Sequence, residues 1–564
     1  MKYYLLLLIV FLHFLSFSQE KYPKDYFRNP LDIPIYLSGS FGELRSNHFH
    51  AGLDIKTQGK EGLKVFASAD GYVSRIKVQQ FGYGKAIYIT HPNGFTSVYG
   101  HLSKFNDEIE EYVKSVQYKK ENYETGNLFF KENKFPLKKG DVIAFSGDTG
   151  GSGSPHLHFE IRNTTTENII NPLHFGIEVK DTTAPTFQSL KAYALSGDSR
   201  INQQKKSFQI PIKNLGNGTY SADRITASGT IGFAASVFDR FNGMPNKNGI
   251  YSLEMLLNGK RFYYHDVETF SFSESKYLNL HIDYEHYKKY KRRYQKTFKE
   301  TANKLSSYEK LINNGKINIQ KGMNYTVQII AKDFEGNTST IKIPVAGKES
   351  NAIFSAQEDT TTYKINAKKF HKFTEDIVTI AFPKNTFYKD LYLDFKVEDQ
   401  IAKIHTPTVP LNKSFTLTFN VSKYTEAEKE QLYIANLEYP KYPRYYYTRK
   451  KDSTFFTTTK TLGNYTLLFD KQKPKIKLLY FKDNQSLENS KSLKVRISDD
   501  DSGIKSWRAT IDDEWVLMQY NHKKGILTYN FNDKKLVGNK HIFKLVVEDN
   551  VGNTNEVSAT FYKK

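Results

Sequence analysis

The sequence predicts a mainly β protein, in which an antiparallel β-sheet domain is followed by further β domains of sandwich type. Tyr and Phe supply 39 and 41 of the 564 residues, and these residue types favour strands. Short segments of alternating hydrophobicity are separated by turn dipeptides such as Asp70-Gly71 and Asn93-Gly94. A chain of this length has outgrown a single hydrophobic core, so we expect several domains of roughly 100–200 residues each.

The N-terminal end has the pattern of a secretory signal peptide, which we place at residues 1–19. Lys2 provides the positive start, residues 5–15 an apolar run interrupted by His13, and residues 16–20 a short polar exit. The run is shorter than the roughly 18–20 apolar residues of a membrane-spanning helix, and no later segment supplies one. We therefore expect an exported protein, periplasmic or secreted and associated with the cell envelope, without a transmembrane segment.

The lack of cysteine and the positive charge limit the chemistry and the partners. Because the chain has no Cys, disulfides and thiolate metal sites are excluded, and stability has to come from packed cores. The 81 Lys and Arg residues against 60 Asp and Glu give a formal net charge of +21, which favours anionic partners. For an exported protein we expect an anionic lipid or cell-wall polymer rather than nucleic acid.

Residues 20–180 show short alternating segments and are expected to form one antiparallel β domain. Within them, residues 107–124 place Ile109, Tyr112, Val113 and Val116 at helical spacing among many charges, which predicts a short amphipathic helix on an inserted loop.

A weak internal repeat marks two similar units in the rest of the chain, which we place at residues 181–347 and 470–564. The segments "AKDFEGNTSTIKI" and "VEDNVGNTNEVSATF" share an Asp-x-x-Gly-Asn turn between two strand-like runs. Upstream of each, "DTTAPTF" and "DKQKPKI" are predicted to be the matching first strands. Both units resemble bacterial immunoglobulin-like β-sandwich domains.

Two further segments complete the organisation. In residues 284–314 of the first sandwich, aromatic residues recur every three or four positions among Lys and Arg. The pattern favours an amphipathic helix laid on a sheet, and the alternative is a basic patch with interleaved aromatics. Residues 348–469 are predicted to be a β domain of unknown type.

Two stretches in the first domain place imidazoles on one face of a strand. In "HFHAGLDI", residues 48–55, His48, His50 and Asp54 share a face, because side chains two apart on a strand point the same way. In "HLHFEIR", residues 156–162, the same rule gives a polar face of His156, His158, Glu160 and Arg162. The intervening residues are apolar and are expected to face a core.

The clustering of histidines argues for a metal site. Seven of the 15 histidines lie between His48 and His174, and His101 follows another strand-like run, "TSVYG". Three N or O ligands with an open fourth position suit a catalytic zinc ion, whose bound water has a pKa of about 7. A closed structural zinc site is not expected, since thiolates are lacking.

At this point the sequence resembles the lysostaphin-type, or LytM-like, zinc endopeptidases that cut peptide cross-links in peptidoglycan. The resemblance rests on "HAGLDI", on "VFASADGYVSRIKVQQFGYGKAIYITHPNGFTSVYGHLS", on "LKKGDVIAFSGDTGGSGSPHLHFEIR" and on Asn171-Pro172. Together these motifs cover most of residues 45–175. The fold that the resemblance implies is a LytM-like antiparallel β-sheet peptidase domain.

The resemblance also implies a role for each site residue. His50 and Asp54 would be the ligands of the H-x-x-x-D motif, and His158 would be the third ligand of Zn²⁺. His101 and His156 would be the catalytic histidines that flank the water and the oxyanion, and which of them is the base stays open.

The remaining polar residues of this region have structural interpretations. We expect His48 to neighbour the site without binding the metal, and His91 to be structural at a turn. Glu160 and Arg162 could pair with each other or border the cleft. The segment from Asn106 to Phe135 is longer than the link usual in the family, and either walls the groove or is a surface excursion.

The leading hypothesis is therefore a zinc metalloendopeptidase that acts on peptidoglycan peptides. One alternative is a non-catalytic, wall-binding regulator or scaffold of the same family. Another treats the C-terminal two-thirds as the main functional part, an adhesin to which the peptidase is appended. On either alternative, other cell-envelope proteins are candidate partners of the C-terminal domains.

Overall fold

The computed structural model describes residues 21–205, 207–349 and 361–564, and it is built mainly of antiparallel β-strands. This confirms the predicted fold class. The signal peptide predicted for residues 1–19 lies outside the described residues. Within the described ranges, no helix is long and apolar enough to cross a membrane.

The first β unit is a long antiparallel sheet with a small second sheet beside it. The strands of the long sheet, in spatial order, are β1 (Leu37–Gly39), β2 (Leu53–Lys56), β11 (His156–Asn163), β6 (Phe95–Leu102), β5 (Lys85–Thr90), β4 (Gly71–Val78) and β8 (Gly126–Phe129). The small sheet has the order β3 (Lys64–Phe66), β10 (Val142–Phe145) and β7 (Lys104–Phe105). Strand β11 therefore lies between β2 and β6, next to both segments that carry predicted site residues.

The predicted core faces of the two histidine-rich stretches are buried. Leu157, Phe159 and Ile161 on β11 are fully buried, as are Leu53 and Ile55 on β2. The strand predicted from residue 48, however, begins only at Leu53.

The physical reason for the late start of β2 is a tight turn before it. Asn47 has a φ of 67°, outside the extended region, and the chain folds back on itself there. The His50 N–H donates to the Glu43 carbonyl and the Gly42 N–H to the His50 carbonyl.

The helix predicted over residues 107–124 is confirmed as α2 (Asp107–Lys120). The Asn106 side chain caps it by accepting from the Ile109 N–H, three acidic residues occupy its first turn, and two lysines its last. Ile109 and Val113 bury the apolar face of α2 in the first unit.

The exposed side of α2 contacts the last β unit of the chain. The Tyr118 and Trp515 rings meet edge-on with centroids 5.2 Å apart, and Lys114 Nζ lies 2.5 Å from the nearly inaccessible Asp533 carboxylate. The inserted segment thus holds the C-terminal unit against the first.

The second unit is a sandwich whose main strands run in the order β15 (Phe208–Ile210), β13 (Thr186–Ala194), β18 (Ile225–Phe238), β26 (Thr338–Gly347), β25 (Asn324–Lys332), β19 (Ser252–Leu257), β20 (Lys260–Asp266) and β23 (Tyr308–Glu309). The short helices α3 (Phe272–Ser275), α4 (Leu278–His281) and α5 (Tyr284–Tyr290) follow β20.

The prediction of a long helix within residues 284–314 was wrong. Only α5 forms, because Lys291 takes the left-handed conformation (φ 59°, ψ 9°) and ends it. Gln295–Lys296 then form strand β22, which pairs with β18. Tyr294 and Phe298, which lie on this non-helical backbone, are buried. For Tyr294 and Phe298, the aromatic spacing reflects burial and not a helix period.

The third unit has two five-stranded sheets and the two-stranded sheet of β27 (Tyr363–Ile365) and β30 (Leu391–Leu393), and the fourth unit has a four-stranded and a five-stranded sheet, each unit with its own core. In the third unit, one five-stranded sheet has the order β28 (His371–Glu375), β29 (Val378–Phe382), β33 (Phe415–Asn420), β37 (Thr454–Thr459) and β36 (Arg449–Lys451). The other has the order β31 (Phe395–Glu398), β32 (Ile401–Ile404), β38 (Gly463–Phe469), β34 (Leu432–Asn436) and β35 (Arg444–Tyr446). In the fourth unit, the four-stranded sheet has the order β39 (Lys475–Leu479), β41 (Ser492–Ser498), β45 (Ile526–Asn530) and β44 (Gln519–Asn521). The five-stranded sheet has the order β40 (Gln485–Ser486), β47 (Thr554–Tyr562), β46 (Lys540–Asp549), β42 (Ile504–Ile511) and β43 (Glu514–Trp515).

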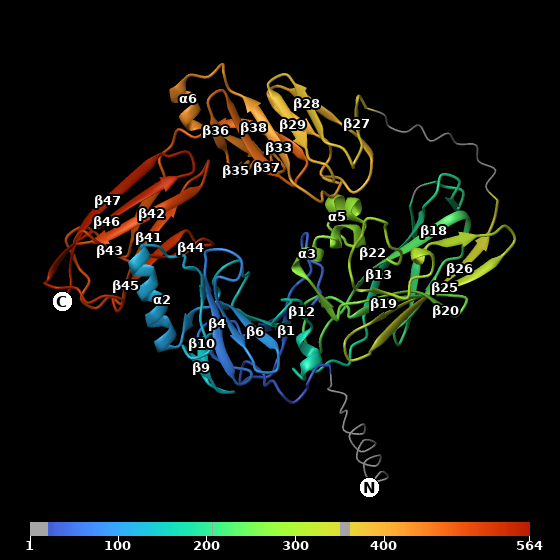
Figure 1. Cartoon of the computed structure of the whole chain (residues 1–564), viewed down its shortest axis with the longest axis horizontal. Coiled ribbons are helices and arrows are strands. Elements are labelled where there is room, and N and C mark those ends of the chain that lie inside the picture. The colour runs from blue at the N-terminus through green and yellow to red at the C-terminus, as the bar shows by residue number, and fades with distance from the viewer. Residues whose placement is uncertain (1–20, 206, 350–360) are drawn as a thin grey trace, which may run out of the picture.

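The four units follow one another around a ring, so that the last lies beside the first (Figure 1). The second and third units touch where Lys288 pairs with Glu438 at 3.2 Å. The turn between β44 and β45 reaches two loops of the first unit: the His522 ring packs on Phe81, and Lys523 Nζ lies 2.7 Å from the Asp148 carboxylate.

A buried histidine pair makes the stability of the second unit pH-dependent. His281 and His265 stack with ring centroids 4.4 Å apart, and burial lowers the pKa of His281 to about 4. Since an unfolded histidine titrates near 6.5, the unfolded chain binds protons below that pH that the folded pair excludes. The stabilisation is therefore complete above pH 6.5 and is lost as the pH falls towards 4, by about 3 kcal/mol for His281.

Thermal unfolding at about pH 7 and pH 5 checks this expectation. His281→Gln should reduce the pH-dependent fall in unfolding temperature, and by more than the surface variant His48→Gln does. An equal fall in the His281→Gln variant would contradict the assignment.

Candidate metal centre

The register of β11 brings the predicted ligands together. His158 lies opposite Asp54 on β2, and on its other side opposite Gly100, the residue before His101 on β6. Gly52 lets the segment before β2 lie close to β11, since a Cβ at position 52 would be only 2.4 Å from the Phe159 carbonyl oxygen. This is the glycine of the "HAGLD" motif.

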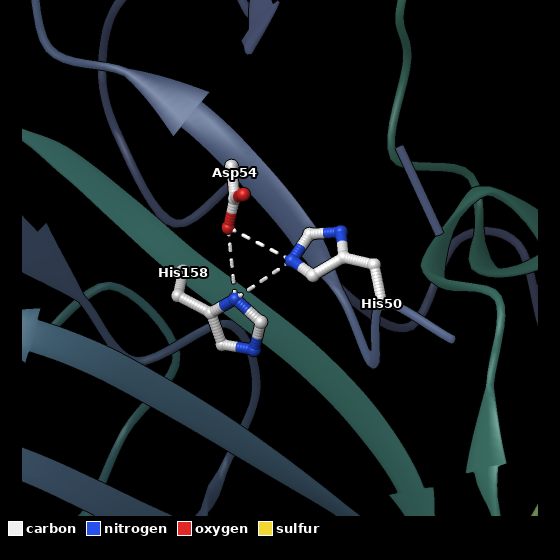
Figure 2. Close-up of side chains that lie close together, drawn as sticks. All are labelled: His50, Asp54 and His158. Carbon is white, nitrogen blue, oxygen red and sulfur yellow. Dashed lines mark hydrogen bonds and ion pairs between the residues drawn. The ribbon is translucent and has the colours of Figure 1, made fainter. Parts of the chain in front are cut away.

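Three side chains meet at one point (Figure 2). His50 Nε2 lies 3.2 Å from His158 Nδ1 and 3.0 Å from Asp54 Oδ1, and His158 Nδ1 lies 2.9 Å from the same oxygen. Tetrahedral zinc with ligand bonds of about 2.0–2.1 Å separates its ligand atoms by about 3.3 Å. The spacing of the three donor atoms therefore fits a zinc ion with a fourth position left open.

The hydrogen bonds of the two imidazoles also fit a metal. His50 Nδ1 lies 2.8 Å from the Ser40 carbonyl, which can only accept, so the proton of the neutral ring is on Nδ1. His158 Nε2 lies 2.8 Å from the Glu160 carboxylate and carries the proton for the same reason. The atoms that face each other are then two nitrogen lone pairs and a carboxylate oxygen. Such a group needs a positive charge at its centre.

The charges around the three donor atoms agree with this. Burial would raise the pKa of Asp54, but His50, with hydrogen bonds from His156 and His158, holds it well below its usual value. Burial would also lower the pKa of His158, yet the carboxylates of Asp54 and Glu160 raise it to about 9. The site therefore attracts one positive charge, which is either a second proton on His158 Nδ1 or a bound metal ion that replaces this proton.

His101 and His156 lie beside this group with their rings 4.7 Å apart. His101 Nδ1 donates to the Thr149 carbonyl at 2.8 Å and His156 Nδ1 to the Ser154 carbonyl at 2.8 Å, so Nε2 of His101 is left as an acceptor and Nε2 of His156 is turned toward Asp54. His156 Nε2 lies 3.4 Å from Asp54 Oδ1. Burial, then the neighbouring His158 and His156, lower the pKa of His101 to about 3, which keeps that ring neutral.

The structure also places the polar residues that the sequence left open. Glu160 and Arg162 pair, as one of the two sequence interpretations held, and Arg162 holds the pKa of Glu160 at about 2 against the effect of burial. His48 is exposed and contacts the Ser46 carbonyl, and His91 is buried between the Asp70 carbonyl and Ser97.

Two site residues were missed from the sequence. Arg45 Nη2 lies 3.0 Å from the second oxygen of Asp54, and the Tyr83 ring stacks on His158 at 5.0 Å while its hydroxyl donates to Glu160. Neither residue lies at an alternate position of a strand-like stretch that carries the site histidines. The only available signal was the position of Tyr83 inside a glycine-flanked "GYG" turn.

Glu160→Gln is expected to lower zinc affinity about 10- to 100-fold, the usual effect of losing a carboxylate behind a metal-binding histidine. Competition with a chromophoric chelator measures it. Glu167→Gln is the matched control, because Glu167 contacts the other side of Arg162 but is half exposed and does not touch His158. Equal affinity in both variants would show that Glu160 does not orient His158.

Comparisons with known proteins agree on the first unit. The family model "Peptidase family M23" matches residues 48–118. The DD-carboxypeptidase/endopeptidase Mpg of Neisseria meningitidis is 31% identical over 158 residues, 28% of this chain and 30% of the relative. The match to peptidase family M23 thus falls on the first β unit, which we call the M23 domain from here on.

Other relatives match the M23 domain in the same way. An uncharacterised metalloprotease of Haemophilus influenzae is 31% identical over 160 residues, 27% of this chain and 28% of the relative. The cell division protein DipM of Caulobacter vibrioides is 28% identical over 127 residues, 22% of this chain and 17% of the relative. The chain thus spans less than a third of the length of each of these curated relatives.

Solved structures similar to the M23 domain include the catalytic domain of lysostaphin from Staphylococcus simulans, with 24% identity, 24% of this chain and 87% of that chain covered, and a TM-score of 0.18. The M23 catalytic domain of EnpA from Enterococcus faecalis has 21% identity, 27% and 98% coverage, and a TM-score of 0.20. In the third unit, the model of a Zu5-like domain matches residues 362–470, a region for which the sequence indicated only an unknown β type.

Proposed function

We propose that the protein is a zinc-dependent endopeptidase that cleaves peptide bonds in peptidoglycan. The observation that carries the proposal is the convergence of His50 Nε2, Asp54 Oδ1 and His158 Nδ1 within 3.2 Å of one another, with the ring protons directed away. The match to peptidase family M23 and the name of the Neisseria relative support the reaction class.

In this proposal His50, Asp54 and His158 hold Zn²⁺, which when bound lowers the pKa of a water ligand to about 7 and polarises a carbonyl. The other residues position these ligands. The Ser40 carbonyl and Glu160 fix the tautomers of His50 and His158, and Arg45 engages the Asp54 oxygen that is not turned to the histidines.

His101 and His156 move the proton. The Nε2 of either ring can accept the proton of the attacking water and later give it to the amine that leaves when the peptide bond breaks. The protonated second imidazole can donate a hydrogen bond to the oxygen that becomes negative in the tetrahedral intermediate. The two backbone carbonyls that hold Nδ1 of each ring keep both Nε2 atoms available for these roles.

Contacts from the appended units suggest how substrate is limited. On one side, His522 and Lys523 touch the loops that carry Phe81 and Asp148. On another, the Tyr287 hydroxyl contacts Ser46 and Asn279 contacts Asn47, just before His48. We infer that the added units fix the loops around the site and restrict it to extended peptide segments of the cell wall, reached after export to the envelope.

Digestion of purified peptidoglycan, followed by mass spectrometry of the muropeptides, tests the proposal. The zinc-loaded protein should release peptides with newly formed termini, lose this activity in a chelator and regain it with zinc. A protein with one bound zinc ion that cuts no peptidoglycan peptide would refute it and would favour the wall-binding regulator instead.

A further inference from the structure

Two clusters of three aspartates, all buried except the half-buried Asp499, occupy equivalent places in the second and fourth units. One consists of Asp181, Asp239 and Asp333, the other of Asp470, Asp499 and Asp549. In each cluster, one oxygen of every residue lies within 4.8 Å of the other two. The clusters contain the first aspartates of the repeated "DTTAP" and "DKQKP" segments and of the two Asp-x-x-Gly-Asn turns.

The same elements build both clusters. The first aspartate precedes the first strand, β13 or β39; the second directly follows the strand paired with it, β18 or β41. The third stands at the end of β25 or β46, before the Gly-Asn turn.

The asparagine of each turn makes matching contacts. Asn337 Nδ2 donates to Asp333 at 2.7 Å and to the Asp181 carbonyl at 3.2 Å. Asn553 Nδ2 donates to Asp549 at 2.7 Å and to the Asp470 carbonyl at 3.1 Å. The repeat thus preserves a three-dimensional arrangement of oxygen atoms as well as a turn.

Part of this oxygen cluster has no partner among the described residues. Asp239 is 1% exposed and Asp181 7% exposed, yet Asp239 Oδ1 and Asp181 Oδ2 have no hydrogen-bond donor. Their carboxyl groups face each other, and the charged groups that affect them most are further carboxylates, not Lys or Arg. In the fourth unit the buried Ser502 hydroxyl also lacks a partner, while the Ser502 N–H donates to Asp470 at 3.1 Å.

Three neighbouring carboxylates that are largely buried and have no counter-charge are unfavourable unless a cation or a proton sits among them. A cation is the better account, because the arrangement occurs twice at equivalent positions of the two units. All donors are oxygens, which excludes the soft and imidazole-preferring metals. We propose that each cluster is a Ca²⁺ site, since Ca²⁺ accepts six to eight oxygen ligands in an irregular geometry, whereas Mg²⁺ requires a near-ideal octahedron.

The position of the sites indicates their use. Asp181 lies where the chain leaves the M23 domain, and Asp470 where it passes from β38 of the third unit to β39 of the fourth. A cation bound there ties the incoming chain to two strand ends of the following sandwich. It would fix the direction in which the sandwich leaves the preceding unit.

Isothermal titration of Ca²⁺ into the full chain, stripped by a chelator and reloaded with one equivalent of zinc, tests the proposal. We expect two bound Ca²⁺ ions per chain with a Kd of about 10⁻³ M or tighter, one ion in Asp239→Asn or Asp499→Asn, and none in the double variant. Ca²⁺ should also raise the unfolding temperature of the wild type, and Mg²⁺ should do so less.

Matched controls separate these sites from the zinc site and from misfolding. His158→Ala and the exposed Asp376→Asn should both keep two Ca²⁺ ions. Since Asn has the shape of Asp, each variant should unfold in chelator at or above the wild-type temperature. The proposal is overturned if the wild type binds no Ca²⁺ at millimolar concentration, if the double variant binds as the wild type does, or if Mg²⁺ binds equally well.

Discussion

His158→Ala is expected to abolish zinc binding and, with it, peptidase activity. The side chain supplies one of the three donor atoms, and its removal leaves His50 Nε2 and Asp54 Oδ1 as a two-ligand site. If the metal contributes several kcal/mol of transition-state stabilisation, activity should fall about 10³-fold or more. Zinc content by mass spectrometry and the rate of muropeptide cleavage measure the two effects separately.

The control for this prediction is His48→Ala. His48 lies two residues before His50 but is exposed, and among the described residues its ring hydrogen-bonds only to the Ser46 carbonyl. It should keep stoichiometric zinc and a rate within a few-fold of the wild type. A His158→Ala protein that cleaved at the wild-type rate would remove His158 from the site altogether.

His101→Ala and His156→Ala are expected to lose activity without losing zinc. Neither ring supplies one of the three convergent atoms, and each Nε2 is free to exchange a proton with the reacting groups. Loss of a positioned general base or acid typically costs about 10²- to 10⁴-fold. The measurement is kcat on a defined muropeptide at saturating substrate, with zinc content determined on the same sample.

The pH dependence of the two variants shows which histidine is the base and which is the oxyanion partner. The variant that lacks the base should lose the acidic limb of the pH–rate profile, whereas the variant that lacks the oxyanion partner should keep that limb at a lower rate. If either variant lost zinc in proportion to its activity, that histidine would be a metal-positioning residue and not a catalytic one.

Much of this centre could be predicted from the residue pattern. The alternation in "HLHFEIR" separated the polar face of β11 from the buried Leu157, Phe159 and Ile161. The same rule grouped His50 with Asp54, although His50 lies in a turn before β2 and not in the strand. The pattern worked there because burial of Phe49 and Ala51 continues through the turn.

Other features could not be predicted because they depend on tertiary contacts. The pairing of β11 with β2 and β6, which sets His158 opposite Asp54, is a register choice made by the whole sheet. Tyr83 and Arg45 reach the site from loops whose path no local pattern determines. In residues 284–314 the aromatic spacing matched a helix, but pairing of Gln295 and Lys296 with β18 prevailed over local propensity.

The contact of α2 with the fourth unit determines when the ring of four units can close during synthesis. Lys114 and Asp533 are 419 positions apart, and Asp148 and Lys523 are 375 apart. Domains generally fold as units from the N-terminal end, so the M23 domain is made long before the partner of its inserted helix exists. The ring can close only after translation has passed residue 533. Until then the loops with Phe81 and Asp148 lack their final neighbours, and a nascent or prematurely ended chain would have an M23 domain with an unfinished rim.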